Sequence, residues 1–339
     1  MEKQTSSYIG AIILPFRLTT AWLFLSAVWR RLVLAPEKHV FESEQWMGHK
    51  INTFFPHSNG PFHWMLDYLL QNPVPLDIFV WLFTISELIL GLLLLAGILS
   101  RFTGLFLAGM AFSLMHTAGW LGPTCLDEWQ IASLLITGGF MMAITGSGRF
   151  SADYWLNQRY PNLKNKRWWQ LAAIPKHNTE SSKFSKTIIA IAVAVLLYVM
   201  GTNQLHHGGV WGKLHNYSKV PGMIVSDAKA VSEDTLEFNL YRDKGPEAHG
   251  SFIIQIQVFD ENNQLIASWG QDELKRFDEK NIDNKYVNEI EPGKHSLVAP
   301  LGARADITLN APDSALLESG TEYHVEVTEI GGKTFSSKK

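Results

Sequence analysis

The chain has 339 residues and a formal net charge of −3. This charge, without a basic patch interleaved with aromatic residues, gives no reason to expect a nucleic-acid partner. The single cysteine, Cys125, excludes an intramolecular disulfide and a cluster held by four thiolates of this chain. The mean hydropathy lies near zero, but the average combines an apolar first part with a polar last part.

Five mostly apolar stretches precede residue 206, at residues 9–33, 77–99, 102–121, 128–145 and 187–205. Each has about 18 residues or more, the length that an α-helix needs to cross a hydrocarbon core of about 30 Å. We therefore expect a multi-pass membrane protein, in which four helices form a bundle and a fifth transmembrane helix follows. The first stretch lacks a small-residue cleavage pattern, so we expect it to remain in the protein.

The distribution of basic residues predicts the orientation of these helices. Residues 149–186 carry many lysines and arginines against only Asp153 and Glu180, which indicates a cytoplasmic segment. The N-terminus is then cytoplasmic, and the tail after residue 205 is extracytoplasmic. The expected domains are a four-helix transmembrane domain at 1–150, a basic linker at 151–186, the fifth helix at 187–205 and an extracytoplasmic domain at 206–339.

The tail has the pattern of a β-domain. Short segments with alternating apolar and polar residues stand between turn sequences such as DKGP and EPGK, at residues 235–241, 251–259, 264–269, 295–302, 303–310 and 322–330. Strands of this length and spacing predict an all-β immunoglobulin-like sandwich. The domain shows no catalytic pattern, so we expect a binding module.

Two arginines depart from the charge rule. Arg30 and Arg31 lie at the outer end of the first apolar stretch, where the positive-inside bias does not place basic residues. One interpretation is that they anchor the helix at the interface, with their charged ends in water. The other is an outward-facing anion site, because a guanidinium pairs well with sulfonate, phosphate or carboxylate oxygens.

Three ionisable residues, Arg17, Glu87 and His116, interrupt apolar stretches, and such residues at membrane depth are candidates for function. The rise of 1.5 Å per residue places Glu87 about 18 Å and His116 about 21 Å from the cytoplasmic ends of their helices. A carboxylate beside an imidazole suits the proton chemistry of a quinol. The alternative is that Glu87 pairs with Arg17 or a helix hydroxyl and only stabilises the bundle.

Several motifs carry a family resemblance. FRLTTAWLFLSAVWRR, KINTFFPHS, ISELILGLLLLAGILSRFTG and GWLGPTCLDEW resemble DoxD, the membrane subunit of thiosulfate:quinone oxidoreductase. HHGGVWGKLHNYSKVP and the strand-rich tail resemble its partner DoxA. The resemblance implies a DoxD–DoxA fusion in a prokaryotic cytoplasmic membrane. The implied reaction oxidises two thiosulfates to tetrathionate outside the membrane and passes the electrons to membrane quinone.

The resemblance directs attention to Cys125, in the loop between the third and fourth stretches. Its thiolate would carry a sulfur adduct that a second thiosulfate attacks, as in disulfide exchange. Asp127 and Glu128 would raise the pKa of the thiol unless cations neutralise them, so we expect them to orient arginines or take protons. Alternatively Asp127 caps the fourth helix, Glu128 favours its positive end, and Cys125 is a small wall residue. The candidate cations are Arg30, Arg31, Lys50 and His57.

Trp120 and Trp129 lie near the same outer interface and, with Glu87 and His116, are candidates for a quinone and proton-transfer site. They are equally typical of an aromatic belt. Quinone is the expected electron acceptor, and no motif indicates haem, flavin or metal ligation. His206, His207 and His215 have a spacing that matches no known metal site.

Two other functions remain open at this point. The chain can be a non-catalytic membrane adaptor whose β-domain binds an extracytoplasmic partner, or a carrier for a small sulfur oxyanion. The sequence leaves the quinone type and the oligomeric state open, with a homo-oligomer among the options. Thiosulfate, quinone and the lipid bilayer are the expected partners.

Overall fold

The computed structural model describes residues 12–122, 128–174, 182–215, 217–246, 251–311 and 317–337. It divides into two compact units. The first contains residues 1–47 and 77–215, and the second contains residues 48–76 and 216–339. In this division residues 48–76, which lie between the first two long helices, belong with the β-domain.

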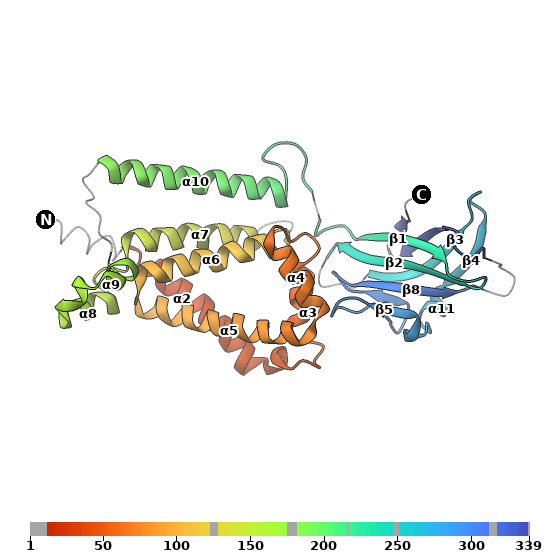
Figure 1. Ribbon diagram of the computed structural model, residues 1–339, viewed down its shortest axis with the longest axis horizontal. Helices are drawn as coiled ribbons and strands as arrows, with labels where there is room; N and C mark the ends of the chain where they lie inside the picture. Colours follow the sequence, from red (N-terminus) through yellow and green to blue (C-terminus); the bar gives the residue numbers. More distant parts are fainter. Residues whose placement is uncertain are drawn as a thin grey trace. The chain divides into compact units, whose positions relative to one another are not determined.

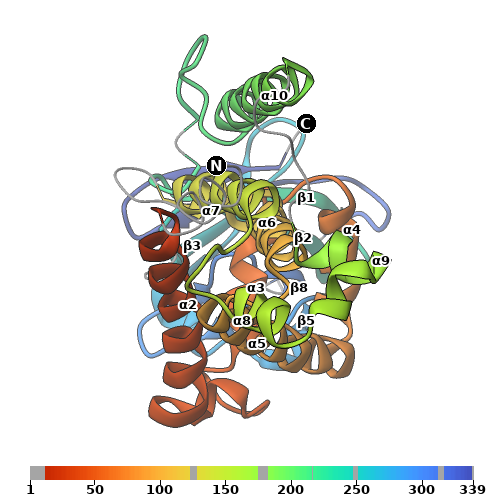
Figure 2. The same cartoon turned by 90° about the vertical axis from the view of Figure 1, so that its left-hand side faces the viewer.

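Four helices share the main core of the first unit: α2 (Leu14–Trp29), α5 (Pro73–Ala96), α6 (Ser100–Ala118) and α7 (Glu128–Thr145). Buried apolar residues from all four meet in one cluster that includes Ala21, Leu90, Leu107 and Met142. Figure 2 shows α2 at one side of the bundle, running from beside α7 towards α5. The predicted helical first part is therefore confirmed.

Facing glycines allow α6 and α7 to approach closely. A Cβ atom on Gly104 would lie 2.5 Å from the carbonyl oxygen of Gly139, and a Cβ on Gly139 would lie 2.5 Å from that of Gly104. Small residues at such crossings let the two helix backbones come into direct contact. The sequence of α6 contains no GxxxG motif that would predict this contact, because the two glycines that meet lie on different helices.

A side chain from the predicted linker closes one end of the bundle. Asp153 lies on α8 (Ala152–Arg159) and accepts hydrogen bonds from the backbone N–H groups of Leu99 and Ser100, both at 2.8 Å. These groups stand at the start of α6, which has no side-chain cap of its own. Asp153 therefore satisfies helix donors that would otherwise lack partners. Two short helices follow, η3 (Pro161–Asn165) and α9 (Arg167–Ala172).

Two of the described helices, α5 and α10 (Ser182–His206), are long and apolar enough to cross a membrane. The other three expected spans correspond to α2, α6 and α7, which have 16, 19 and 18 residues. The helix positions agree with the predicted stretches to within a few residues at most of their ends. A five-span topology and its orientation stay predictions.

The second unit joins an α-helical hairpin to the β-domain. The hairpin consists of α3 (Met47–Phe54) and α4 (Pro61–Gln71), and we call it the α3–α4 hairpin. Asn52 on α3 is fully buried. Its side-chain amide donates to the carbonyl of Gly302 at 2.9 Å, and its oxygen accepts from the backbone N–H of Asn288 at 2.9 Å. Tyr286 donates to Asp67 on α4 at 2.8 Å.

The β-domain consists of two antiparallel sheets. Its strands are β1 (Gly222–Ala230), β2 (Thr235–Lys244), β3 (Ser251–Phe259), β4 (Leu265–Gly270), β5 (Ile282–Asn284), β6 (Glu291–Pro292), β7 (Leu297–Ala299), β8 (Arg304–Asn310), β9 (His324–Glu329) and β10 (Thr334–Ser336). One sheet has the order β1-β2-β8-β5, and the other has β10-β9-β3-β7-β6 with β4 also paired to β3. Residues of both sheets, such as Phe238 and Ile256, form one core. The all-β antiparallel domain is therefore confirmed, and its immunoglobulin-like type stays a prediction.

Each of the six segments predicted as strands overlaps one, and β3 has the predicted bounds. The alternation pattern missed β1, β5, β6 and β10. In β1 the pairing with β2 shifts register between Ser226 and Lys229, and Asp227 has a φ of 55°. A bulge of this kind breaks the two-residue period on which strand prediction depends. The other three have at most three residues.

Candidate functional site

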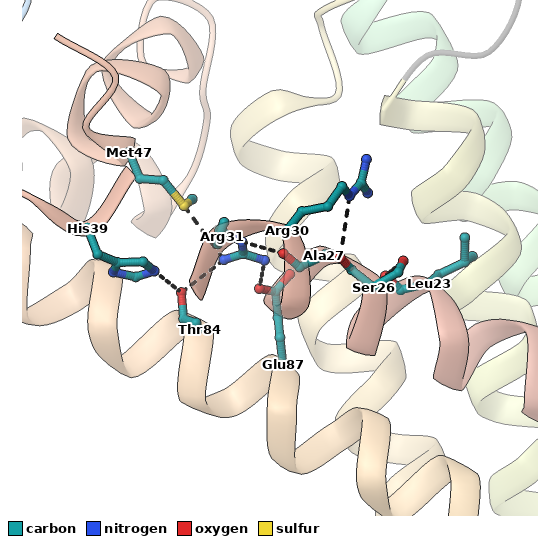
Figure 3. A network of polar contacts seen from close by, with 9 residues as sticks. All are labelled: Leu23, Ser26, Ala27, Arg30, Arg31, His39, Met47, Thr84 and Glu87. Carbon is teal, nitrogen blue, oxygen red and sulfur yellow. Dashed lines mark hydrogen bonds and ion pairs between the residues drawn. The ribbon is translucent and has the colours of Figure 1, made fainter. Parts of the chain in front are cut away.

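A buried ion pair joins the first two long helices. Arg31 lies in the π-helical turn η1 (Arg30–Leu34) that continues α2, and its Nη2 pairs with the carboxylate of Glu87 on α5. Its Nη1 donates to Thr84 Oγ1 at 2.9 Å, one turn earlier on α5 (Figure 3). Both charged side chains are about 10% exposed. Each charge therefore neutralises the other in a site that excludes most water.

His39 extends this network, and the sequence analysis missed it. It lies in η2 (Pro36–His39), with Nε2 at 3.2 Å from Thr84 Oγ1 and its ring centroid at 4.3 Å from that of Trp81. Burial, and then the nearby Arg31 guanidinium, lower the pKa of His39, so the imidazole is neutral. The Thr84 hydroxyl therefore lies between the Arg31 guanidinium, from which it accepts, and the His39 imidazole. No periodic pattern marks a histidine in so short a turn.

Arg30 and Arg31, treated together in the sequence analysis, have different surroundings. Arg30 is exposed, and within the described part of the chain its guanidinium donates from Nε to the carbonyl of Ser26, at 3.4 Å. Figure 3 shows its guanidinium directed away from Glu87. Arg31 is neutralised by Glu87 and is not an accessible cation. Of the two, only Arg30 presents donors to a solvent-borne anion.

The alternative in which Glu87 pairs with Arg17 is wrong. Arg17 donates to the backbone carbonyls of Ser147 at 3.3 Å and Phe150 at 2.7 Å, which follow α7. It precedes Arg31 by 14 residues, or about 21 Å of helix, so it lies toward the other end of α2. The pairing partner could not be read from the sequence, because three arginines, Arg17, Arg30 and Arg31, occupy the first apolar stretch.

His116 also has a different neighbour from the one expected. Its Nε2 lies 3.0 Å from the hydroxyl of Tyr198 on α10, and its ring centroid lies 6.4 Å from that of His206. The described contacts of Glu87 do not include His116. The expectation that Glu87 and His116 meet rested on their similar depth along two helices taken as parallel. Depth does not fix the direction in which each helix is rotated, which depends on packing. We name the group His116, Tyr198, Trp129 and His206 the α10 cluster.

Of the two tryptophans near this cluster, Trp120 is buried and Trp129 is half-buried. Trp129 donates from Nε1 to Thr202 Oγ1 on α10 at 3.1 Å, and its ring lies 6.0 Å from that of His207. Trp120 is 1% exposed, which is not the position of an aromatic belt facing lipid. Glu128 is the first residue of α7. Cys125 and Asp127 lie outside the described residues, in the segment between α6 and α7.

The two remaining anion-site candidates belong to the second unit. Lys50 is exposed, with Nζ 5.3 Å from the ring centroid of Phe54. The ring of His57 stacks on Tyr217 with centroids 4.1 Å apart, and its Nε2 lies 4.0 Å from the Asp243 carboxylate. A carboxylate at this distance opposes the binding of an anion. The structure therefore does not gather the four predicted cations in one unit.

The described residues contain no group of three or more His, Cys, Asp or Glu side chains arranged to hold a metal ion. The arrangement in the first unit instead offers hydrogen-bonding and proton-transfer groups. They form two sets, the Arg31–Glu87 network and the α10 cluster.

Comparison with known families accounts for most of the chain. Residues 12–177 match the family model of the thiosulfate:quinone oxidoreductase (TQO) small subunit DoxD, and residues 206–338 match that of the TQO small subunit DoxA. No solved structure matches the chain. A helical unit that matches one oxidoreductase subunit, followed by a β-domain that matches another, defines a fused oxidoreductase. The chain belongs to the DoxD and DoxA families in tandem, as a DoxD–DoxA fusion.

Proposed function

We propose that the chain oxidises thiosulfate to tetrathionate on the outer side of a prokaryotic cytoplasmic membrane and reduces membrane quinone. The observation that carries this proposal is the tandem match to both TQO subunits. Two thiosulfates, one quinone and two protons give one tetrathionate and one quinol. Two electrons therefore leave sulfur, and two protons must reach the quinone oxygens.

The sulfur step is assigned to Cys125. Its thiolate forms an S–S bond with the outer sulfur of one thiosulfate, and the two electrons released pass to quinone. The outer sulfur of a second thiosulfate attacks the sulfur that is bonded to Cys125 Sγ, the Sγ–S bond breaks, and tetrathionate leaves as the thiolate returns. The sequence places this cysteine directly between the ends of α6 and α7, where Trp120 and Trp129 flank it. Asp127 and Glu128 then serve as proton acceptors or orient cations.

We propose that thiosulfate first binds at Arg30. Its exposed guanidinium has donors directed away from Glu87, and a planar guanidinium forms paired hydrogen bonds with sulfonate oxygens. Arg31 acts indirectly, because its pairing with Glu87 and Thr84 holds η1 in place. Lys50 and His57 remain proposed thiosulfate contacts, with His57 the weaker because Asp243 lies beside it.

The quinone is proposed to bind at the α10 cluster. Trp120 and Trp129 provide aromatic surface, and His116 provides an imidazole whose Nε2 lies beside the Tyr198 hydroxyl. Glu87 is a further proposed proton carrier in the Arg31–Glu87 network. No haem, flavin or metal is part of this scheme, in which electrons pass from sulfur to quinone.

The test is thiosulfate-dependent reduction of a quinone analogue by the purified chain, with tetrathionate measured as the product. We expect wild type to turn over and Cys125→Ser to be inactive. Arg30→Gln should raise the KM for thiosulfate about 10- to 100-fold, because a hydrogen bond to a charged group contributes about 1.5–3 kcal/mol. Arg159→Gln, at an exposed arginine of α8, is the matched control.

Each other outcome selects a different function. Equal turnover by wild type and Cys125→Ser would remove the cysteine adduct and keep the enzyme. If neither reacts, even with the native quinone, the adaptor and carrier functions take precedence. Accumulation of labelled thiosulfate in vesicles without an electron acceptor then identifies a carrier, and its absence leaves the adaptor.

A further inference from the structure

The helix α10 stands between the two family matches. The DoxD match ends at residue 177 and the DoxA match begins at residue 206, so only the last residue of α10 falls within either. Most of its apolar surface is not covered by the protein, and Ile189 and Leu197 are more than 60% exposed. By length and composition alone α10 is a membrane-crossing connector.

The contacts of α10 with the bundle are concentrated near its C-terminal end, where Figure 1 shows it approaching α7. Tyr198 packs against the apolar core that Met115 and Ile136 form between α6 and α7. Thr202 is 5% exposed and His206 is 3% exposed, whereas the apolar residues before them face outward. The buried part of α10 is thus its polar part.

Three side chains of this end, from Tyr198, Thr202 and His206, lie beside polar or aromatic side chains of the bundle. The Tyr198 hydroxyl lies 3.0 Å from His116 Nε2, and Thr202 Oγ1 accepts from Trp129 Nε1 at 3.1 Å. His206 lies beside His116, with ring centroids 6.4 Å apart. A helix that only connects two domains needs none of these groups, and buried polar and ionisable groups at membrane depth carry an energetic cost. Their presence at the buried end of α10 therefore indicates a function other than anchoring.

We propose that Tyr198 and His206 of α10 complete, with His116, the proton-transfer site for quinone reduction. This inference rests on the proposed function. Two electrons from sulfur and two protons convert the quinone carbonyls to hydroxyls. The hydrogen-bonded pair of His116 and Tyr198 hands protons to a quinone oxygen, and His206, at the end of α10 where the chain leaves the helix, replaces them. Thr202 is a positioning residue that holds Trp129 against the head group.

The first test removes one oxygen atom. Tyr198→Phe keeps the ring that packs on α6 and α7 and loses the hydroxyl that contacts His116. We expect kcat for quinone reduction to fall about 10²-fold, the usual scale for a lost acid–base group, with the thiosulfate KM unchanged and an altered solvent deuterium isotope effect. His206→Gln should act in the same direction. Tyr154→Phe, at a half-exposed tyrosine of α8, is the matched control and should behave as wild type.

The second test needs no turnover. A photoactivatable quinone analogue, added without thiosulfate and competed by excess quinone, should label peptides that contain residues 198–206. Labelling there without thiosulfate oxidation by wild type would refute the proposed function and keep the quinone site on α10. Unchanged kcat in Tyr198→Phe, or labelling confined to other helices, would overturn the inference.

Discussion

The α3–α4 hairpin is predicted to unfold together with the β-domain, and Asn52→Ala tests this. The Asn52 side chain is fully buried and bonds the carbonyl of Gly302 and the N–H of Asn288. Its removal leaves a buried donor and a buried acceptor without their partner. Each such group costs about 1–3 kcal/mol, so we expect a loss of about 3 kcal/mol in the free energy of unfolding of the second unit.

The measurement is thermal unfolding of the full chain in detergent, followed by near-ultraviolet circular dichroism. In a unit of about 150 residues, a loss of 3 kcal/mol lowers Tm by about 6–12 °C. Asn262→Ala, at an exposed asparagine in the β3–β4 turn, is the control and should leave Tm unchanged. A Tm for Asn52→Ala within about 2 °C of wild type would show that the hairpin separates from the sandwich before the sandwich unfolds, and would refute the reasoning.

Three further predictions concern stability. Arg242 is fully buried in the sandwich and donates to the carbonyl of Ala299. Arg242→Ala should therefore lower the free energy of unfolding of the domain by about 3–5 kcal/mol in urea, whereas Arg242→Met, which keeps the apolar volume, should lower it clearly less. Equal losses for the two variants would contradict this prediction. Gly139→Leu should abolish the close α6–α7 contact and lower the yield of folded protein in gel filtration, while Gly109→Leu, at an open position of α6, should not. Burial, then the hydrogen bond to Asp67, raises the pKa of Tyr286 from 10.0 to about 12. The contribution of Tyr286 to stability is therefore present below pH 10 and is lost as the pH rises to about 12. Tyr286→Phe should flatten the dependence of the unfolding free energy on pH in that range, and an unchanged dependence would exclude this tyrosine as its cause.

The sequence alone was sufficient for features that depend on local pattern. The long apolar stretches located α5, α6, α7 and α10, because an apolar run and its polar flanks define a helix without reference to its neighbours. The two-residue alternation located β2, β3, β8 and β9 for the same reason. It failed at β1, where a bulge breaks the alternation. The family motifs led to the DoxD–DoxA assignment.

The partners of the buried charges were decided only by the tertiary structure. The sequence analysis offered Arg17, a helix hydroxyl and His116 as partners of Glu87. The actual partner is Arg31, which lies in the π-helical turn that follows α2. Tyr198 meets His116 across 82 residues of sequence. Asn52 fixes a helix of the first half to the β-domain across 250 residues. A sequence pattern records the period of one element, whereas helix rotation and contacts between distant elements follow from how complete surfaces pack together.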